Sequence, residues 1–223
     1  MTKVCLADDL FISPLSPNES WVLGLLLTDG CVYTQGNNCY ISICSIDKDI
    51  IEKIKDIMMC GNITFMKGGR IRTKDPEKDS WKWRVCSKGL YERLSFFGMT
   101  PRKTMILEFP NTDVLSLPDF VRGAWDGDGS ISIGTEKRWT TKKKILSASF
   151  GCASLSFIQA LWELLKPVTK SQSNIYVKNE FGHINYTGVK AISLLEWIYK
   201  DSSESNRMNR KYDKYLDYLR KEV

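Results

Sequence analysis

Two stretches of this chain carry the same pattern of apolar and polar positions. Residues 21–30, WVLGLLLTDG, are apolar almost all round and end in Asp-Gly, and residues 120–129, FVRGAWDGDG, end in the same way. An apolar run without a polar face predicts a helix that is buried on most sides. The alternating segments that follow, 31–35 (CVYTQ) and 130–134 (SISIG), are typical of strands. An internal repeat is therefore the organising feature of the sequence.

The two copies remain similar beyond these strands. Residues 40–54 and 144–158 each begin with strand-like alternation and continue with helical periodicity. Basic strand-like runs and one further amphipathic helix follow in both copies. We therefore predict an α+β fold with two pseudo-symmetric halves. Each half has the order helix, strand, strand, helix, strand, strand, helix.

The second copy is longer than the first. Asp29 and Asp128 are 99 residues apart, whereas Arg102 and its counterpart Arg210 are 108 residues apart. The second copy therefore holds an insertion, and we assign part of it to a lengthened basic hairpin around residues 136–144 (EKRWTTKKK).

Local signals for helix ends divide the chain into parts. Asn18 predicts the start of the first motif helix, and Ser116 with Asp119 forms the pattern of a capping box before the second. Gly98 predicts the end of a helix, because glycine favours the position after a helical C-terminus. The predicted parts are an N-terminal arm (1–17), a first half (18–100), a linker with two prolines (101–117) and a second half (118–223).

Composition places the chain among ordinary globular proteins. Of its 223 residues, 43% are hydrophobic and 26% are charged, which excludes a largely disordered chain. No apolar run is long enough to cross a membrane, and the first residues do not resemble a signal peptide, so we expect an intracellular protein. The net charge of +6 permits a nucleic-acid partner without requiring one.

Cysteine and histidine usage excludes several kinds of site. The seven cysteines are odd in number and contain no Cys-x-x-Cys pair, so the sequence supports neither a disulfide framework nor a zinc knuckle. We expect small buried thiols. His183 is the single histidine, which excludes chemistry that needs paired histidines.

Small residues recur inside both motif helices. Gly24 and Thr28, like Gly123 and Gly127, are four positions apart and therefore share one helical face. A glycine inside a helix costs about 1 kcal/mol relative to alanine, so two such glycines need a reason. We predict that the two helices pack against each other through these faces, with Gly24 and Gly123 at the interface. The alternative is that the glycines are tolerated in two separate core helices.

An aspartate ends each of these helices. A carboxylate at a helix C-terminus faces the negative end of the helix dipole, so Asp29 and Asp128 both need a compensating cation. If the helices run parallel, the two acids lie side by side and form a site of hard oxygen ligands that suits Mg²⁺. The alternative is that each Asp-Gly pair simply begins a turn.

At this point the two segments resemble the signature motifs of the LAGLIDADG homing endonucleases, in the form in which one chain carries both copies. VLGLLLTDG keeps the glycine at position 24, the acid at 29 and the final glycine at 30. VRGAWDGDG keeps Gly123, Asp126, Asp128 and Gly129, whereas the first copy has Leu27 in place of an acid. Two motifs about a hundred residues apart make the resemblance specific, and it extends from about residue 18 to the C-terminus.

The resemblance implies a fold and an activity. The expected fold has two αββαββα halves packed through the paired motif helices, with antiparallel saddle-shaped sheets over DNA. The expected activity is site-specific cleavage of both strands at a long, non-palindromic target by metal-dependent phosphodiester hydrolysis. The implied partner is double-stranded DNA, bound by a monomer without a membrane. The implied cofactor is Mg²⁺, two or three ions, with Mn²⁺ as a substitute. Bacterial or phage cytoplasm and an organelle are equally compatible locations.

The resemblance also implies roles for individual residues. Asp29 and Asp128 would coordinate the metal, with the backbone carbonyls of Thr28 and Gly127. Lys103 and Lys211 match the family's basic residues near the scissile phosphates, and Arg102 and Arg210 are rivals one position away. The family's water-ordering Gln is missing. The nearest positions are Ser45 and Cys152, or Asp47 and Ser154 in a shifted register.

Strand alternation predicts which side chains face the DNA. A sheet face rich in Arg, Lys, Asn, Gln and Tyr suits the major groove, whereas the alternative is an ordinary solvated sheet face. The predicted DNA-binding residues are Tyr33, Gln35, Arg70, Arg72, Lys82, Arg84, Ser132, Arg138, Lys142, Lys143, Asn174, Tyr176 and Lys178.

Other functions remain open at this stage. A group I intron RNA maturase or a catalytically inactive DNA-binding protein would share the fold, but an inactive protein is expected to lose the acids. A plain α/β binding module with coincidental Asp-Gly turns is the remaining alternative.

Overall fold

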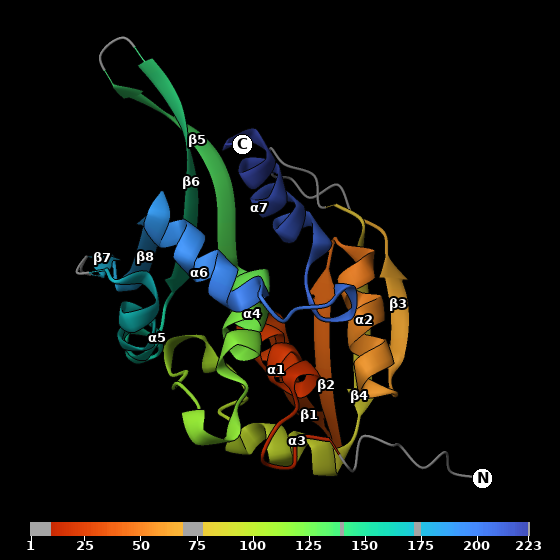
Figure 1. The fold of residues 1–223 in the computed structure, drawn as a ribbon. Helices are drawn as coiled ribbons and strands as arrows, with labels where there is room; N and C mark the ends of the chain where they lie inside the picture. Colours follow the sequence, from red (N-terminus) through yellow and green to blue (C-terminus); the bar gives the residue numbers. More distant parts are fainter. Residues whose placement is uncertain (1–9, 69–77, 139–140, 172–174, 223) are drawn as a thin grey trace.

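The computed structural model describes residues 10–68, 78–138, 141–171 and 175–222 (Figure 1). The first half contains α1 (Pro17–Asp29), β1 (Gly30–Gln35), β2 (Asn38–Ser45), α2 (Lys48–Met58), β3 (Asn62–Met66), β4 (Ser80–Cys86) and α3 (Lys88–Phe96). The second half contains α4 (Leu117–Asp128), β5 (Gly129–Arg138), β6 (Thr141–Cys152), α5 (Leu155–Thr169), β7 (Tyr176–Lys178), β8 (Phe181–Thr187), α6 (Val189–Tyr199) and α7 (Asn209–Glu222).

The two halves have the same topology. Their sheets have the strand orders β1-β2-β4-β3 and β5-β6-β8-β7, and all neighbouring strands are antiparallel. This confirms the predicted α+β fold with two αββαββα halves. The second half has one helix more than the predicted repeat, namely α7. At the equivalent position, the described residues of the first half form only the short 3₁₀ turn η2 (Lys103–Met105).

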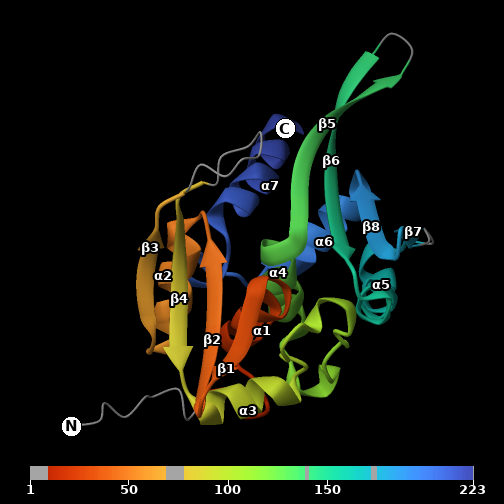
Figure 2. The same ribbon diagram turned by 180° about the vertical axis from the view of Figure 1, so that it is seen from behind.

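The helices cover one side of the two sheets. In Figure 1, α2, α6 and α7 lie in front of the strands, and the view from behind in Figure 2 looks onto the uncovered strand faces. Three tryptophans, Trp21, Trp83 and Trp125, are fully buried in the core. Among the described residues, no helix is long and apolar enough to span a membrane.

The prediction of buried thiols is wrong for three cysteines. Cys31, Cys44 and Cys86 are exposed, whereas Cys152 is buried. The reason is strand alternation, because the exposed cysteines lie on the uncovered face of the first sheet.

The start of α1 differs from the prediction. Its N-cap is Ser16, two residues before Asn18. The Ser16 hydroxyl accepts from the Glu19 N–H at 3.3 Å, and the Glu19 carboxylate accepts from the Ser16 N–H at 2.9 Å. This reciprocal capping box, with Pro17 as the first helical residue, outweighs Asn18 as a cap.

The other predicted helix ends are closer to the structure. Ser116 is the N-cap of α4, as predicted, but its hydroxyl donates to the Asp119 carboxylate and its N–H donates to the Ser20 hydroxyl at 3.0 Å. Neither bond of the predicted capping box is therefore present, and that prediction is wrong. Gly98 adopts φ +90° after the end of α3, which confirms the predicted glycine stop.

The insertion lies where the sequence predicted it. Strands β5 and β6 have 10 and 12 residues, whereas β1 and β2 have 6 and 8. The additional pairs run from Thr135 opposite Lys144 to Arg138 opposite Thr141. Figure 1 shows that this hairpin projects well beyond the body of the molecule.

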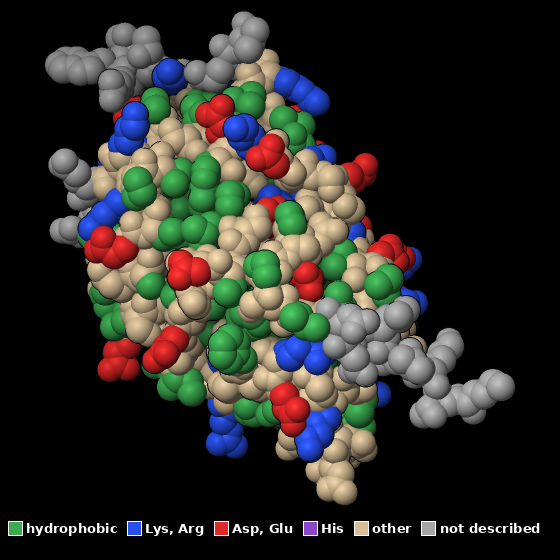
Figure 3. Space-filling view, turned by 60° about the horizontal axis from the view of Figure 1, so that its bottom comes forward, with side chains coloured by type: hydrophobic (Ala, Val, Ile, Leu, Met, Phe, Trp, Pro, Cys, Tyr) green, Lys and Arg blue, Asp and Glu red, His purple; other side chains and the backbone are tan. Residues whose placement is uncertain are grey.

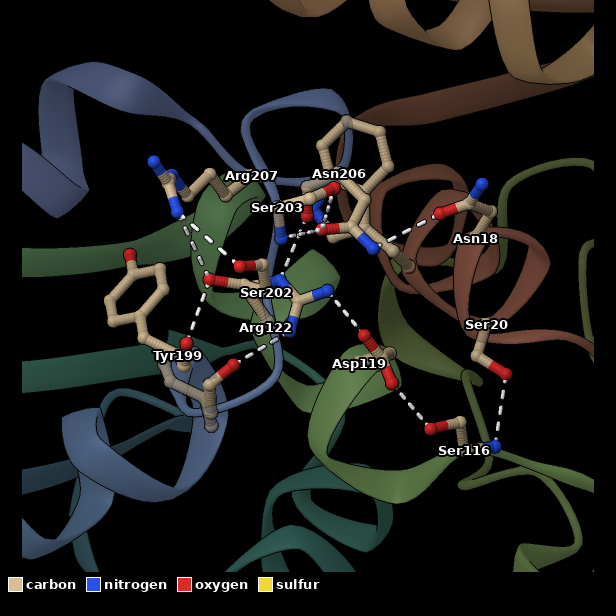
Figure 4. A network of polar contacts seen from close by, with 12 residues as sticks. Asn18, Ser20, Ser116, Asp119, Arg122, Tyr199, Ser202, Ser203, Asn206 and Arg207 are labelled. Carbon is tan, nitrogen blue, oxygen red and sulfur yellow. Dashed lines mark hydrogen bonds and ion pairs between the residues drawn. The ribbon is translucent and has the colours of Figure 1, made fainter.

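A buried polar network connects the two halves on the helical side (Figure 4). Arg122 of α4 is 1% exposed, pairs with Asp119 and donates to the carbonyl oxygens of Ile198 and Asn206 at 2.7 and 2.8 Å. The Asn206 side chain then donates to Asn18 in the first half at 3.0 Å. Every nitrogen of the Arg122 guanidinium is therefore paired, and these bonds offset the desolvation cost of burying its charge.

Candidate active site

The paired helices α1 and α4 are in backbone contact. A Cβ atom on Gly123 would lie 2.0 Å from the carbonyl oxygen of Trp21, and one on Gly24 would lie 2.2 Å from that of Phe120. Real Cβ atoms essentially never come so close, so both positions require glycine. The third close approach is that of Gly127 to Thr28, where a Cβ would lie 2.1 Å from the Thr28 hydroxyl. Because Gly24 meets Gly123 and Thr28 meets Gly127, the helices run in the same direction and end together.

The two acids lie at these joined ends. A Cβ on Gly127 would be 3.3 Å from a carboxylate oxygen of Asp29, so α4 closely approaches the Asp29 side chain. Although Asp29 is solvent-exposed overall, partial enclosure of its carboxyl group and repulsion from Asp128 raise its pKa from 3.8 to about 6, against the opposing charges of Lys211 and Lys103. Enclosure also raises the pKa of Asp128. Both carboxyl groups therefore ionise less readily than they would in water.

Both predicted lysines lie at the ends of the motif helices. Lys103 is 8% exposed, and its Nζ donates to the carbonyl oxygen of Gly30 at 2.6 Å. Lys211 is 6% exposed, and its Nζ lies 2.6 Å from the equivalent carbonyl oxygen of Gly129. Burial lowers the pKa of both ammonium groups, that of Lys211 to about 8. The two ammonium groups thus supply part of the positive charge that the acids at the helix ends require.

The rival arginines point elsewhere. Arg210 forms an ion pair at 2.9 Å with Asp47, the N-cap residue of α2, and Arg102 is exposed at a left-handed position with φ +58°. In each Arg-Lys pair, therefore, the lysine lies beside the acids.

A cavity of about 490 Å³ opens next to Asp128. Lys103, Cys152 and His183 are among its lining residues. Cys152 is one of the four positions considered for the missing Gln, whereas Ser45 is not part of this cavity, Asp47 is engaged by Arg210, and the Ser154 hydroxyl donates to the Leu107 carbonyl.

Sequence reasoning missed His183 as part of this site. His183 lies on β8, next to the cavity-lining end of β6, because it pairs with Gly151. No local motif signals this placement, because it depends on pairing between strands far apart in the chain.

Asp126 is a second residue whose role the sequence did not reveal. It is fully buried, and one of its carboxylate oxygens accepts from the Trp21 indole N–H and from the Met208 N–H, both at 2.9 Å. Trp21 belongs to α1 and Met208 immediately precedes α7. Asp126 therefore joins the first half, α4 and the start of α7, and Leu27 in the first motif cannot accept such bonds.

The donor set at the joined helix ends fits a hard divalent cation. Two carboxylates from different halves converge with backbone carbonyl oxygens at the negative ends of two helix dipoles. Among the described residues, no group of three or more His, Cys, Asp or Glu is arranged so that it could hold a metal ion, so a metal here would depend on carbonyls and water for its remaining ligands.

The predicted DNA-facing residues of the first sheet that the structure describes share its uncovered face. Tyr33 stacks on Tyr40 with ring centroids 5.1 Å apart, and the Arg84 guanidinium lies 5.3 Å from the Tyr40 ring. Lys82 shares this face, and Gln35 is exposed.

The second sheet presents the remaining predicted positions that the structure describes. Ser132, Lys143, Tyr176 and Lys178 are exposed. In the long hairpin, Arg138 pairs with Thr141 and Lys142 pairs with Lys137. By strand alternation the Lys142 position is on the face opposite to that of Lys143, so its predicted place on the DNA-facing side is wrong. Arg70, Arg72 and Asn174 lie outside the described residues.

The end of the molecule at α3 carries charged side chains of both signs. Figure 3 views the molecule from the side of α3, and the coloured Lys, Arg, Asp and Glu side chains are intermixed there without a patch of one sign among the described residues. A larger hollow of about 760 Å³ lies at the other end of α1, beside Asn18 and Glu19. Neither Asp29 nor Asp128 lines it.

Comparison with known proteins places the fold. No protein-family model matches the sequence. An uncharacterized protein of Methanocaldococcus jannaschii is 30% identical over 131 residues, which are 57% of this chain and 48% of that protein, so the match spans about half the length of this curated relative.

Solved structures match along almost the whole chain. I-SmaMI bound to an uncleaved DNA target in the presence of calcium ions has a TM-score of 0.57 at 14% identity and covers 92% of this chain and 90% of its own. The LAGLIDADG meganuclease I-CpaMI bound to uncleaved DNA has a TM-score of 0.56 at 13% identity and covers 93% of both chains. The chain therefore has the LAGLIDADG homing endonuclease fold.

Proposed function

We propose that this protein is a site-specific DNA endonuclease of the LAGLIDADG homing type. It binds a long, non-palindromic duplex as a monomer and cuts both strands by metal-dependent phosphodiester hydrolysis. The observation that carries the proposal is the convergence of Asp29 and Asp128 at the joined ends of α1 and α4. One chain supplies an acid from each half, so one chain suffices for two strands.

The acids are the expected metal ligands. Asp29 and Asp128 would hold Mg²⁺ together with the carbonyl oxygens of Thr28 and Gly127. When bound, Mg²⁺ lowers the pKa of water and offsets charge on the reacting phosphate, and Mn²⁺ fulfils the same role. The raised pKa of Asp29 supports this assignment, because a cation would favour the ionised pair that the free protein disfavours.

The surrounding residues supply positive charge for the substrate. Lys103 and Lys211 place positive charge beside the acids, where the phosphate becomes more negative during hydrolysis. The uncovered sheet faces bind the duplex on either side, with Arg84 and Lys82 in the first half and the long hairpin in the second. The structures of I-SmaMI and I-CpaMI described above were determined on uncleaved DNA, which supports a duplex as the ligand.

The presence of both acids argues against an inactive DNA-binding protein. A binding module has no reason to keep two carboxylates at helix C-termini, where each opposes a helix dipole. An RNA maturase activity does not compete with this proposal, because one protein can have both activities.

The proposal is tested by selecting a target and cutting it. Duplexes that bind the protein in Ca²⁺ are isolated from a random library, and the selected duplex is then incubated with Mg²⁺ or with EDTA. We expect breaks in both strands with Mg²⁺ and none with EDTA. The matched variants Asp29→Asn and Asp128→Asn should abolish double-strand cleavage while retaining binding in Ca²⁺. Cleavage by both variants at the wild-type rate, or failure to select any duplex, would contradict the proposal.

A further inference from the structure

The two lysines beside the acids are held very differently. The Lys211 ammonium lies within hydrogen-bond distance of four carbonyl oxygens, three in the last turn of α4 and one at its C-cap residue. These belong to Trp125 (2.7 Å), Asp126 (2.7 Å), Gly127 (3.1 Å) and Gly129 (2.6 Å). Because an ammonium group has three N–H donors, Lys211 has none left for a phosphate or a water molecule.

Lys103 has free donors by the same count. Within the described part of the chain, the acceptor of its ammonium is the Gly30 carbonyl oxygen at 2.6 Å. Gly30 is the counterpart of Gly129, so Lys103 repeats one of the four bonds of Lys211 and lacks the other three. Two of its N–H donors remain available.

The difference follows from what carries each lysine. Lys211 lies in the first turn of α7, whose start is held by Asp126 through Met208 and by Arg122 through the Asn206 carbonyl. Lys103 lies in the short 3₁₀ turn η2, followed by the exposed residues 104–106. Lys211 is thus fixed by a docked helix, whereas Lys103 is carried by a surface turn.

The surroundings of the two ammonium groups agree with this difference. Lys103 lines the cavity of about 490 Å³ together with Asp128, His183 and Cys152, whereas Lys211 is not among the lining residues. Space for a phosphodiester therefore exists beside Lys103.

We infer that Lys103 is the lysine that contacts the DNA phosphate, that Lys211 is an internal cap of α4, and that the two strands are consequently cut at different rates. This inference rests on the proposed nuclease function. The strand whose scissile phosphate lies beside Lys103 is cut first, because a donor aimed at the phosphate stabilises its developing charge. A duplex that is nicked in this strand and still intact in the other then accumulates as an intermediate.

The experiment measures both strands separately. The selected duplex carries a different dye on each strand, and single-turnover rates are followed for the wild type, Lys103→Met and Lys211→Met. Lys103→Met should slow one strand roughly 100-fold, and this should be the strand that the wild type cuts first. Equal slowing of both strands by Lys103→Met would overturn the inference.

Thermal unfolding without DNA tests the cap independently of cleavage. Lys211→Met removes the ammonium donor from four carbonyl oxygens, of which that of Trp125 still accepts from the Gly129 N–H. It should lower the melting temperature by about 5–10 °C, or prevent folding. Lys103→Met should lower it by about 2 °C or less, because one bond is lost. Lys214→Met is the matched control one turn along α7, where the ammonium has a single long contact of 3.4 Å with the Ile131 carbonyl.

The outcomes separate the inference from the proposed function. An unchanged melting temperature for Lys211→Met, with selective slowing of the second strand, would make the lysines equivalent and overturn the inference. A wild-type protein that cuts no DNA would contradict the proposed function, while the unfolding data still decide whether Lys211 is a cap.

Discussion

The contact between α1 and α4 predicts the effect of adding one methyl group to either helix. In Gly123→Ala the new Cβ would lie 2.0 Å from the Trp21 carbonyl oxygen, and in Gly24→Ala it would lie 2.2 Å from that of Phe120. A comfortable contact for a carbon atom is about 3.5 Å, so the contacting atoms would have to separate by roughly 1.5 Å. The facing atoms belong to the backbone and cannot rotate away, which places both substitutions at the severe end of overpacking.

The free energy can be worked out from two opposing terms. Overpacking costs up to about 3 kcal/mol, whereas alanine improves helix propensity over glycine by about 1 kcal/mol. The net loss is about 2 kcal/mol, which corresponds to a fall in melting temperature of about 4–8 °C for a chain of this length. Separation of the helices also moves Asp29 away from Asp128, so the folded fraction should lose cleavage.

Thermal unfolding and DNA cleavage of the same preparations provide the assay. Gly134→Ala is the matched control for stability, because its Cβ would meet no atom closer than the Ile145 side chain at 3.7 Å. We expect its melting temperature to remain near that of the wild type. If Gly24→Ala and Gly123→Ala both raise the melting temperature and cleavage stays intact, the helices are not in close contact and the shared two-acid site loses its geometric basis.

Three further predictions concern the DNA surface and the acids. The logarithm of the DNA-binding constant should fall steeply with the logarithm of salt concentration, and Lys82→Met should reduce the slope by about 0.9 if its ammonium contacts a phosphate; a flat response in fluorescence titrations would mean that the predicted strand faces do not bind DNA. Residues 135–138 and 141–144 pair beyond the length of the first-half hairpin. Their removal should shorten the hairpin by about 13 Å and the DNA footprint of the second half by about four base pairs. An unchanged hydroxyl-radical footprint would exclude the hairpin from binding. In metal-free buffer at neutral pH, Asp29→Asn should slightly raise the melting temperature, because burial and Asp128 disfavour the charged carboxylate; a fall in calorimetry would show that the carboxylate stabilises the free protein.

The sequence by itself determined the elements and their repetition. Period-two and period-3.6 patterns depend on neighbours in the chain, so the order of helices and strands, the lengthened hairpin and the two acids at helix ends were all predictable from residues such as Asp29 and Asp128. The glycines at 24 and 123 also pointed to a helix pair, because their cost in an isolated helix demanded an explanation.

Tertiary structure decided which side chains meet. Lys211 reaches carbonyl oxygens of residues more than 80 positions earlier, and Asp126 joins Trp21 to Met208 across similar distances. Such contacts depend on how α7 docks against α4, and no local pattern distinguishes Lys211 from Arg210 beforehand. The placement of His183 at the cavity likewise follows from strand pairing between β6 and β8. Local propensity specifies each element, whereas the chemistry of the site arises from long-range packing that brings distant elements together.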